Sequence, residues 1–104
     1  MRVLEFNVSG TTLNKDKRCN FEHIIRNSVN FLQCSFLFDN TWRNFAKVAV
    51  FVAGFKEYPV LIQDNKAAVP SEATKRETFN VYIVGQDVEG TKLQTNRIEI
   101  EQEA

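Results

Sequence analysis

The chain has 104 residues, the size of one ordinary domain, so we expect one hydrophobic core and a single domain over residues 1–104. Thirteen basic residues balance thirteen acidic ones, and this zero net charge argues against a general nucleic-acid binder and against a polybasic membrane-docking protein. The hydrophobic fraction of 43% and the charged fraction of 25% are typical of globular proteins, and nine Phe residues favour β-sheets. Composition therefore predicts a soluble, β-rich domain.

Alternation of apolar and polar residues predicts the strands of the first half of the chain. Residues 4–9 alternate with period two and form an opening strand, after which the charged residues 14–18 indicate a solvated loop. The same alternation predicts strands at residues 19–25 and 32–38. Residues 42–45 are expected to form one helical turn, which points the Trp and Phe at its two ends in the same direction.

The second half of the chain contains further strand signals, at residues 47–53, 56–62, 67–69, 79–84 and 97–101. Residues 47–53 are apolar on both faces, which indicates a central strand. Pro59 cannot donate a hydrogen bond to a neighbouring strand, so residues 56–62 are expected to form an edge strand. Pro70 begins a second helical turn. Seven or eight short strands without a long amphipathic helix predict an all-β sandwich or small barrel and exclude a parallel βαβ architecture.

The two cysteines, Cys19 and Cys34, do not form a disulfide, redox or zinc motif in the sequence. They are too few for a disulfide-scaffolded secreted domain, and neither belongs to a Cys-x-x-Cys pair. We expect two small, reduced, buried side chains. The N-terminus lacks the apolar segment of a signal peptide, and no apolar run approaches the roughly 18 residues of a membrane span. The sequence therefore predicts synthesis in a reducing cytoplasm and no membrane association.

Side chains that could take part in catalysis or metal binding are few and lie scattered along the sequence. His23 is the only histidine, and it alternates in register with apolar neighbours, so a structural role is expected. Three carboxylates alternate along the last strand, where a solvent-facing side explains them better than a divalent cation does: Glu99, Glu101 and Glu103. The basic cluster at residues 15–18 offers too few phosphate contacts for nucleic-acid binding. No catalytic, cofactor or metal site is assigned, and an enzyme is not expected.

The middle of the chain carries a series of aromatic and apolar residues with fixed spacing: Phe36, Phe38, Asp39, Trp42, Phe45, Lys47, Ala49, Val50 and Phe51. Further landmarks follow at residues 58–60, 69–73, 79–85 and 93–96. In residue type and order, this series resembles a module in the virion proteins of bacteriophages that infect Gram-positive and gut bacteria. The module occurs at the N-termini of baseplate and tail-fibre proteins and in small stand-alone phage proteins. This chain has Arg43 and Asn44 where the family often has Gly, and Val48 where it often has Thr.

The resemblance implies an immunoglobulin-like antiparallel β-sandwich with one or two single helical turns. We expect Trp42 and Phe45 to close one end of the sandwich beneath the strand that carries Phe36 and Phe38. The stem of Lys47 is expected to cover the Trp ring, and Phe51 belongs to the central strand. Gly85 is expected to permit the turn into the last hairpin, and residues 95–96 to satisfy a bulge.

The resemblance further implies a non-enzymatic structural protein of the virion, made in the host bacterial cytoplasm. Such a subunit belongs to the baseplate or tail, or decorates the capsid, and its partners are other virion proteins. A homo-oligomer is expected, with a trimer favoured and a monomer as the alternative.

The residues proposed for interaction are Lys56, Tyr58 and Val60, on an edge strand that adds to a neighbouring sheet, together with Arg43. The alternative function is a small intracellular phage effector that binds a host protein or a signalling nucleotide. For that function, the candidate pocket residues are Trp42, Arg43 and Tyr58.

Overall fold

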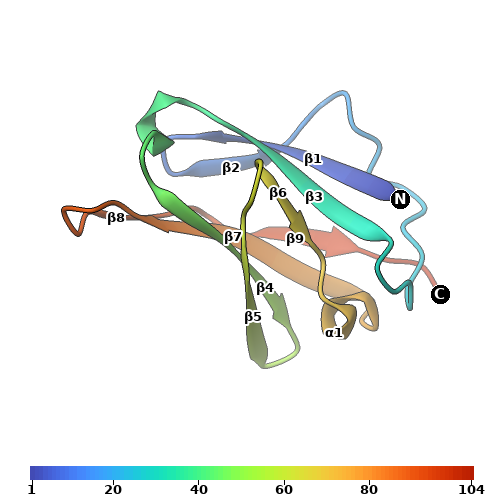
Figure 1. Ribbon diagram of the computed structural model, residues 1–104. Coiled ribbons are helices and arrows are strands. Elements are labelled where there is room, and N and C mark those ends of the chain that lie inside the picture. The colour runs from blue at the N-terminus through green and yellow to red at the C-terminus, as the bar shows by residue number, and fades with distance from the viewer.

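Two β-sheets pack face to face in the computed structural model, which describes residues 1–104 (Figure 1). The four-stranded sheet contains, in spatial order, β2 (Thr12–Lys15), β1 (Arg2–Ser9), β3 (Leu32–Phe38) and β6 (Lys66–Ala68). The five-stranded sheet contains β5 (Lys56–Leu61), β4 (Ala46–Ala53) and β7 (Thr78–Gln86), followed by β8 (Lys92–Gln94) and β9 (Ile98–Glu101), which both pair with β7. The predicted all-β sandwich is confirmed, but it has nine strands rather than seven or eight, because the short strands β2 and β8 have no counterpart among the predicted ones.

The two helical elements are single turns, η1 (Asn40–Trp42) and α1 (Ser71–Thr74). α1 lies where the sequence predicts a turn after Pro70, whereas η1 begins two residues before the turn predicted at residues 42–45 and overlaps it only at Trp42. Neither is long and apolar enough to cross a membrane. Asp39 caps η1, since its carboxylate accepts a hydrogen bond from the backbone N–H of Thr41 at 3.1 Å. After η1, Asn44 adopts a left-handed backbone conformation with φ of 67°, which Asn tolerates better than most residues.

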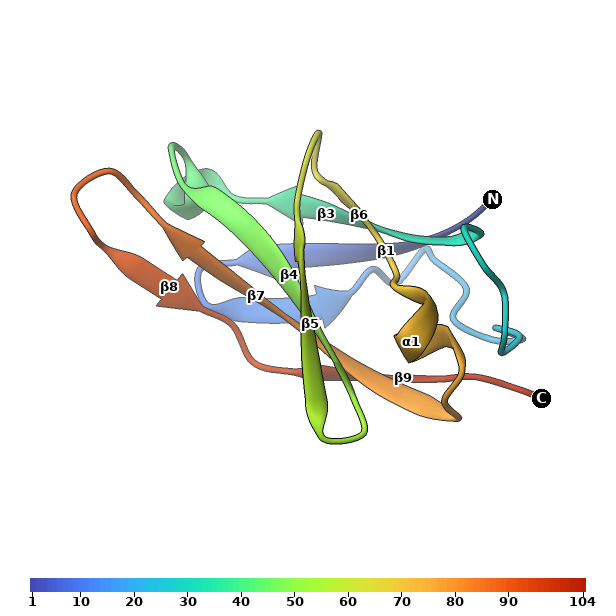
Figure 2. The same ribbon diagram turned by 60° about the horizontal axis from the view of Figure 1, so that its bottom comes forward.

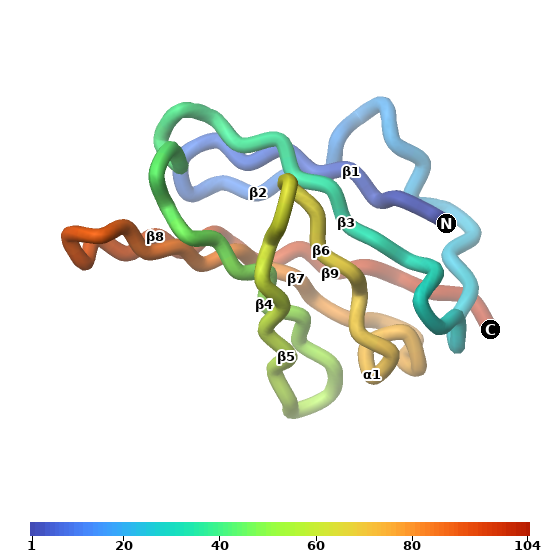
Figure 3. Tube along the Cα trace, in the orientation of Figure 1, coloured from blue at the N-terminus to red at the C-terminus, as the bar shows by residue number.

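All strand pairs are antiparallel except β1 with β3, which run parallel from the Arg2–Leu32 pair to the Val8–Phe38 pair. The pair is parallel because β2 runs back along one edge of β1, so the chain reaches the other edge from the end at which β1 begins, and Leu32 starts β3 beside Arg2. Residues 16–31 make this passage without a helix or a strand, as the trace in Figure 3 shows.

The strand predicted at residues 19–25 is wrong, because this segment is an irregular loop with one isolated bridge at Ile25. Three residues in and after it have positive φ, which interrupts extended backbone: His23, Asn27 and Asn30. The guanidinium of Arg2 holds the loop in place by donating to the backbone carbonyl oxygens of Asn20, Glu22 and His23. The predicted loop at residues 14–18 is also wrong at its start, because residues 14 and 15 belong to β2.

The core is one cluster of 19 buried side chains, and a row of aromatic rings runs through it from the middle of β1 to the residue before β4, with the partly buried Phe38 and Phe45 packed against the cluster. Successive ring centroids lie 5.4, 6.0, 5.4 and 5.9 Å apart along Phe6, Phe36, Phe38, Trp42 and Phe45. Phe51 lies elsewhere in the same core, 6.1 Å from Phe79. The indole Nε1 of the fully buried Trp42 donates to the carbonyl oxygen of Gly10 at 2.7 Å, so its one polar group is satisfied.

Two residues near the Trp ring have roles that differ from the expected ones. Gly85 lies inside β7, and a Cβ atom there would be only 2.6 Å from Cζ3 of Trp42, so the glycine makes room for the ring rather than a turn. The Nζ atom of Lys47 lies 5.1 Å from the ring centroid of Phe38, not over Trp42, and donates to the carbonyl oxygen of Phe45. Both residues therefore support the packing of the aromatic row.

Thr95 and Asn96, in the connection between β8 and β9, use their side chains to bond backbone groups of other strands, and the bonds of Asn96 join the edges of the two sheets. Asn96 accepts from the backbone N–H of Leu13 at 2.7 Å and donates to its carbonyl oxygen at 3.1 Å, which reproduces a strand-like pair with β2. The hydroxyl of Thr95 accepts from the backbone N–H of Ile83 at 2.9 Å. These contacts give hydrogen-bond partners to backbone groups of Leu13 and Ile83, beside the gap between the end of β8 and the start of β9.

Candidate interaction surface

The outward face of the five-stranded sheet carries apolar side chains along its central strands. On β4, Ala49, Phe51 and Ala53 are buried in the core, so the alternating residues between them point away from it. The strand register places residues of β5 and β7 beside these outward side chains. We call the resulting set the apolar strip, which consists of Val48, Val50, Val52, Pro59, Leu61, Tyr82 and Val84. This strip is apolar surface on the side of the sheet that faces away from the core.

Exposure varies across the apolar strip. Leu61 is 55% exposed, whereas Val50 and Tyr82 are only 6% and 7% exposed because their neighbours on the same face cover them. The rest of this face is polar at both ends of β7. Lys92 pairs with the residue that ends β7, and the carboxylates of β9 lie beside its first residues.

Tyr82 is the one member of the apolar strip with a polar side-chain group, and it contacts two charged residues on the same face. Its hydroxyl donates to a carboxylate oxygen of Glu57 at 2.8 Å, and the guanidinium of Arg97 lies 4.8 Å from the centre of its ring. Arg97 also approaches Glu57, with 3.7 Å between the charged atoms. Burial, reinforced by the bond to Glu57, raises the pKa of Tyr82 above its ordinary value of 10.0, so the phenol stays neutral at physiological pH.

A hollow of about 500 Å³ lies where β4, β7 and β8 meet. Its apolar lining continues the strip through Val48, Val84 and Leu93, and Lys92 stands at its rim. Lys92, at the positive end of this face, is separated along β7 from the negative end by about 20 Å at Glu99 and about 27 Å at Glu101.

The structure places the four predicted interaction residues in different environments. Lys56 is exposed on β5, but Tyr58 and Val60 are half-buried and pack against the core, because they pair with Phe51 and Ala49. Arg43 is exposed at the end of η1, and the eight residues of β4 separate it from the turn before Lys56 by roughly 25 Å. The four residues do not form one cluster. On β5, the outward-facing residues are instead Glu57, Pro59 and Leu61.

The edge position predicted for β5 is observed, since β5 pairs with β4 alone. Ile62 donates its backbone N–H to Lys47 at 3.0 Å, so by alternation the backbone groups of Glu57, Pro59 and Leu61 face the open edge. Pro59 has no N–H, and it thus removes the central donor from this edge. Pairing with another strand through β5 is limited by this gap.

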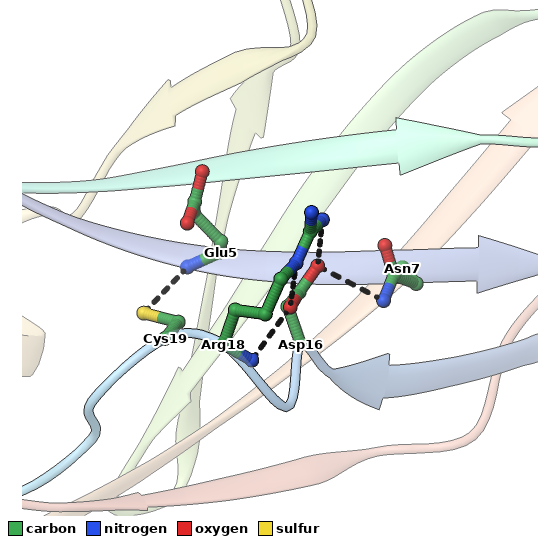
Figure 4. Close-up of polar contacts among 5 residues, drawn as sticks. All are labelled: Glu5, Asn7, Asp16, Arg18 and Cys19. Carbon is green, nitrogen blue, oxygen red and sulfur yellow. Dashed lines mark hydrogen bonds and ion pairs between the residues drawn. The ribbon is translucent and has the colours of Figure 1, made fainter.

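Asp16 is a polar residue whose environment the sequence does not reveal. It lies beside β1 on the outer side of the four-stranded sheet, where its carboxylate accepts hydrogen bonds from Arg18 at 2.8 and 3.2 Å and from Asn7 at 3.2 Å (Figure 4). The bonds from Arg18 lower the pKa of Asp16 from 3.8 to about 2. Nearby, the thiol of Cys19 accepts from the backbone N–H of Glu5 at 3.4 Å. Together these contacts fasten the loop to the edge of β1 where β2 has ended.

The remaining reactive side chains lie apart from one another. Both cysteines are free, and the burial of Cys34 raises the pKa of its thiol far above its ordinary value. His23 is exposed and its Nδ1 lies 3.0 Å from a carboxylate oxygen of Glu103. No group of three or more His, Cys, Asp or Glu side chains is arranged to hold a metal ion.

Comparisons of the chain with protein-family models, with curated proteins and with solved structures found no match. The resemblance to phage virion modules, and the partners and location that it implies, therefore stay predictions. The surface of the sandwich is the remaining source of functional inference.

Proposed function

We propose that this chain is a non-enzymatic structural subunit of a phage particle, and that it assembles with copies of itself through the apolar strip. The observation that supports this proposal best is the apolar outward face of β4. In an antiparallel sheet with one solvated face, the residues that point outward are usually polar. On β4, the outward-pointing residues are instead Val48, Val50 and Val52. Contiguous apolar surface with a polar rim is typical of protein–protein contacts.

The charges around the apolar strip favour a second copy of this chain as the partner. Lys92 lies at one end of the face, and Glu99 and Glu101 lie at the other. When two copies stack with their β7 strands antiparallel, the basic end of each lies over the acidic end of the other. Such a twofold contact uses the same patch on both subunits. The trimer implied by the resemblance would instead require head-to-tail contacts between different patches.

Substitution of Leu61 tests the apolar strip, because this side chain is 55% exposed and has little role in the core. Leu61→Lys places a charge in the proposed contact, so we expect the variant to be monomeric where the unmodified chain is dimeric. Leu37→Lys is the matched control, since Leu37 is 64% exposed on β3 in the other sheet. Light scattering coupled to size-exclusion chromatography gives the mass of each variant.

Several outcomes of this experiment would contradict the proposal. A monomeric unmodified chain at high concentration would do so, and so would a Leu61→Lys variant that keeps the original mass. If the unmodified chain is a trimer and Leu61→Lys is a monomer, the apolar strip is still the contact, but the twofold arrangement is wrong. Location is tested separately by quantitative mass spectrometry of purified particles against infected-cell lysate, where enrichment in particles is expected. Abundance in lysate without incorporation into particles would favour the intracellular effector.

A further inference from the structure

A second surface feature is a cationic pocket of about 440 Å³ next to α1, away from the apolar strip. Three segments that are distant in sequence line it: the long loop, the β4–β5 turn and the connection from α1 to β7. None of the six lining residues is hydrophobic, and they are Arg26, Gly54, Lys75, Arg76, Glu77 and Thr78. Figure 2 shows α1, the start of β7 and the β4–β5 turn side by side.

The positive charges in this pocket are poorly compensated within the chain. Glu77 is its one carboxylate; its nearest oxygen is 4.0 Å from a terminal nitrogen of Arg26, and its side chain is 83% exposed. The Nε atom of Arg26 is buried and has no hydrogen-bond partner. Neither Lys75 nor Arg76 takes part in an ion pair within 4.0 Å. Three cations thus face one loosely held carboxylate, an arrangement that a bound anion would stabilise.

The backbone around the pocket is held in place. Arg26 donates its backbone N–H to Glu103, and Asn27 donates to Thr74, both at 2.7 Å. The side-chain amide of Gln102 donates to the carbonyl oxygens of Ala73 and Arg76, at 3.1 and 2.8 Å. The loop, α1 and the residues after β9 are therefore tied together beneath the pocket, which lowers the entropic cost of binding a ligand there.

The absence of a side chain at Gly54 leaves room for the guanidinium of Arg76 in the pocket. A Cβ atom on Gly54 would lie 2.7 Å from a terminal nitrogen of Arg76, so any other residue would displace that group. Gly54 also has a φ of 65°, a conformation that residues with a side chain rarely adopt. The turn between β4 and β5 therefore lets Arg76 lie flat against it.

We propose that the cationic pocket binds a doubly charged phosphate group, either inorganic phosphate or a phosphate monoester. Guanidinium groups match the paired oxygens of phosphate, and a lysine adds a point charge. A dianion would balance the excess of two positive charges left by three cations and one carboxylate. Thr78 adds a hydroxyl group at the wall of the pocket. None of the lining residues belongs to the apolar strip, although Thr78 pairs with Glu101 at the acidic end of the same sheet face.

The test is a titration of the ¹⁵N-labelled full chain, observed by NMR, with three probes at matched ionic strength. Inorganic phosphate and phenyl phosphate are expected to shift the amide signals of Gly54 and residues 75–78, whereas dimethyl phosphate, a singly charged diester, shifts them much less. Shifts no larger than those from sodium chloride would overturn the proposal. Equal affinity for the diester would overturn the assignment of a doubly charged group.

Variants distinguish a built site from general attraction to positive charge. Arg76→Gln is expected to weaken phosphate binding about tenfold, the effect of losing one charged hydrogen bond. Arg43→Gln removes an exposed arginine outside the pocket and is expected to leave the affinity unchanged. Equal losses in the two variants would overturn the proposal. Leu61→Lys is expected to bind phosphate with the same affinity as the unmodified chain, whatever its oligomeric state, because Leu61 does not line the pocket.

Discussion

Replacing Gly85 with alanine places a methyl group against the indole ring of Trp42. The new carbon would lie 2.6 Å from Cζ3 and 3.1 Å from Cε3 of the ring, and 3.2 Å from the carbonyl oxygen of Ala46. The ring cannot withdraw easily, because it is fully buried between Phe38 and Phe45 and its Nε1 is bonded to Gly10. Overpacking of this kind costs about 1–3 kcal/mol of unfolding free energy.

A double-mutant cycle with Trp42→Phe assigns that cost to the ring. Both crowded carbons belong to the six-membered ring of the indole, and a smaller phenyl ring relieves the contact with a methyl group at position 85. We therefore expect Gly85→Ala to cost at least about 1 kcal/mol less in the Trp42→Phe background than in the unmodified chain.

Chemical denaturation followed by circular dichroism measures all four proteins of the cycle, including those without tryptophan. Two results would refute the reasoning: a Gly85→Ala chain as stable as the unmodified one, or a cost that is the same in both backgrounds. In a thermal scan, each kcal/mol corresponds to a midpoint change of about 4–8 °C for a domain of this size.

Two other predictions concern polar contacts. Asn96→Ala removes both bonds to the backbone of Leu13, so we expect a loss of about 1–3 kcal/mol in chemical denaturation, and a loss below about 0.5 kcal/mol would show that water replaces the amide. The depressed pKa of Asp16 implies stability that is fully present above the ordinary pKa of 3.8 and is lost as the pH falls toward 2. In the Asp16→Asn variant, we expect the denaturation midpoint to change less with pH between 3.8 and 2 than in the unmodified chain. The same pH dependence in both proteins would contradict a role for the carboxylate.

The strands could be predicted where alternation reflects burial in a sheet. Residues 32–38 and 47–53 match β3 and β4 closely, and β4 is central as its two apolar faces predict. Alternation misleads at residues 19–25, where Phe21 packs edge-on against Phe6 from a loop. The backbone turns at His23, so Ile24 is buried and Ile25 is 51% exposed.

The candidate sites depend on spatial relations that the sequence does not contain. An apolar outer face on β4 predicts burial, yet no element of this chain covers it. The register of β5 with β4 turns Tyr58 and Val60 inward and Leu61 outward, which reverses the expected choice of residues. The cationic pocket joins residue 26 to residues 75–78, and only the folded loop brings these segments together.

The bond between Asn96 and Leu13 has a consequence for synthesis of the chain. The two residues are 83 positions apart, so the edge of β2 lacks this partner until Asn96 has been synthesised. At about 5–20 residues per second, translation of that interval takes roughly 4–17 seconds. During this time, the nascent β1–β2 hairpin presents an open edge able to pair with other chains. The edge of β2 is therefore more exposed to pairing with other chains during translation than after the sandwich has formed.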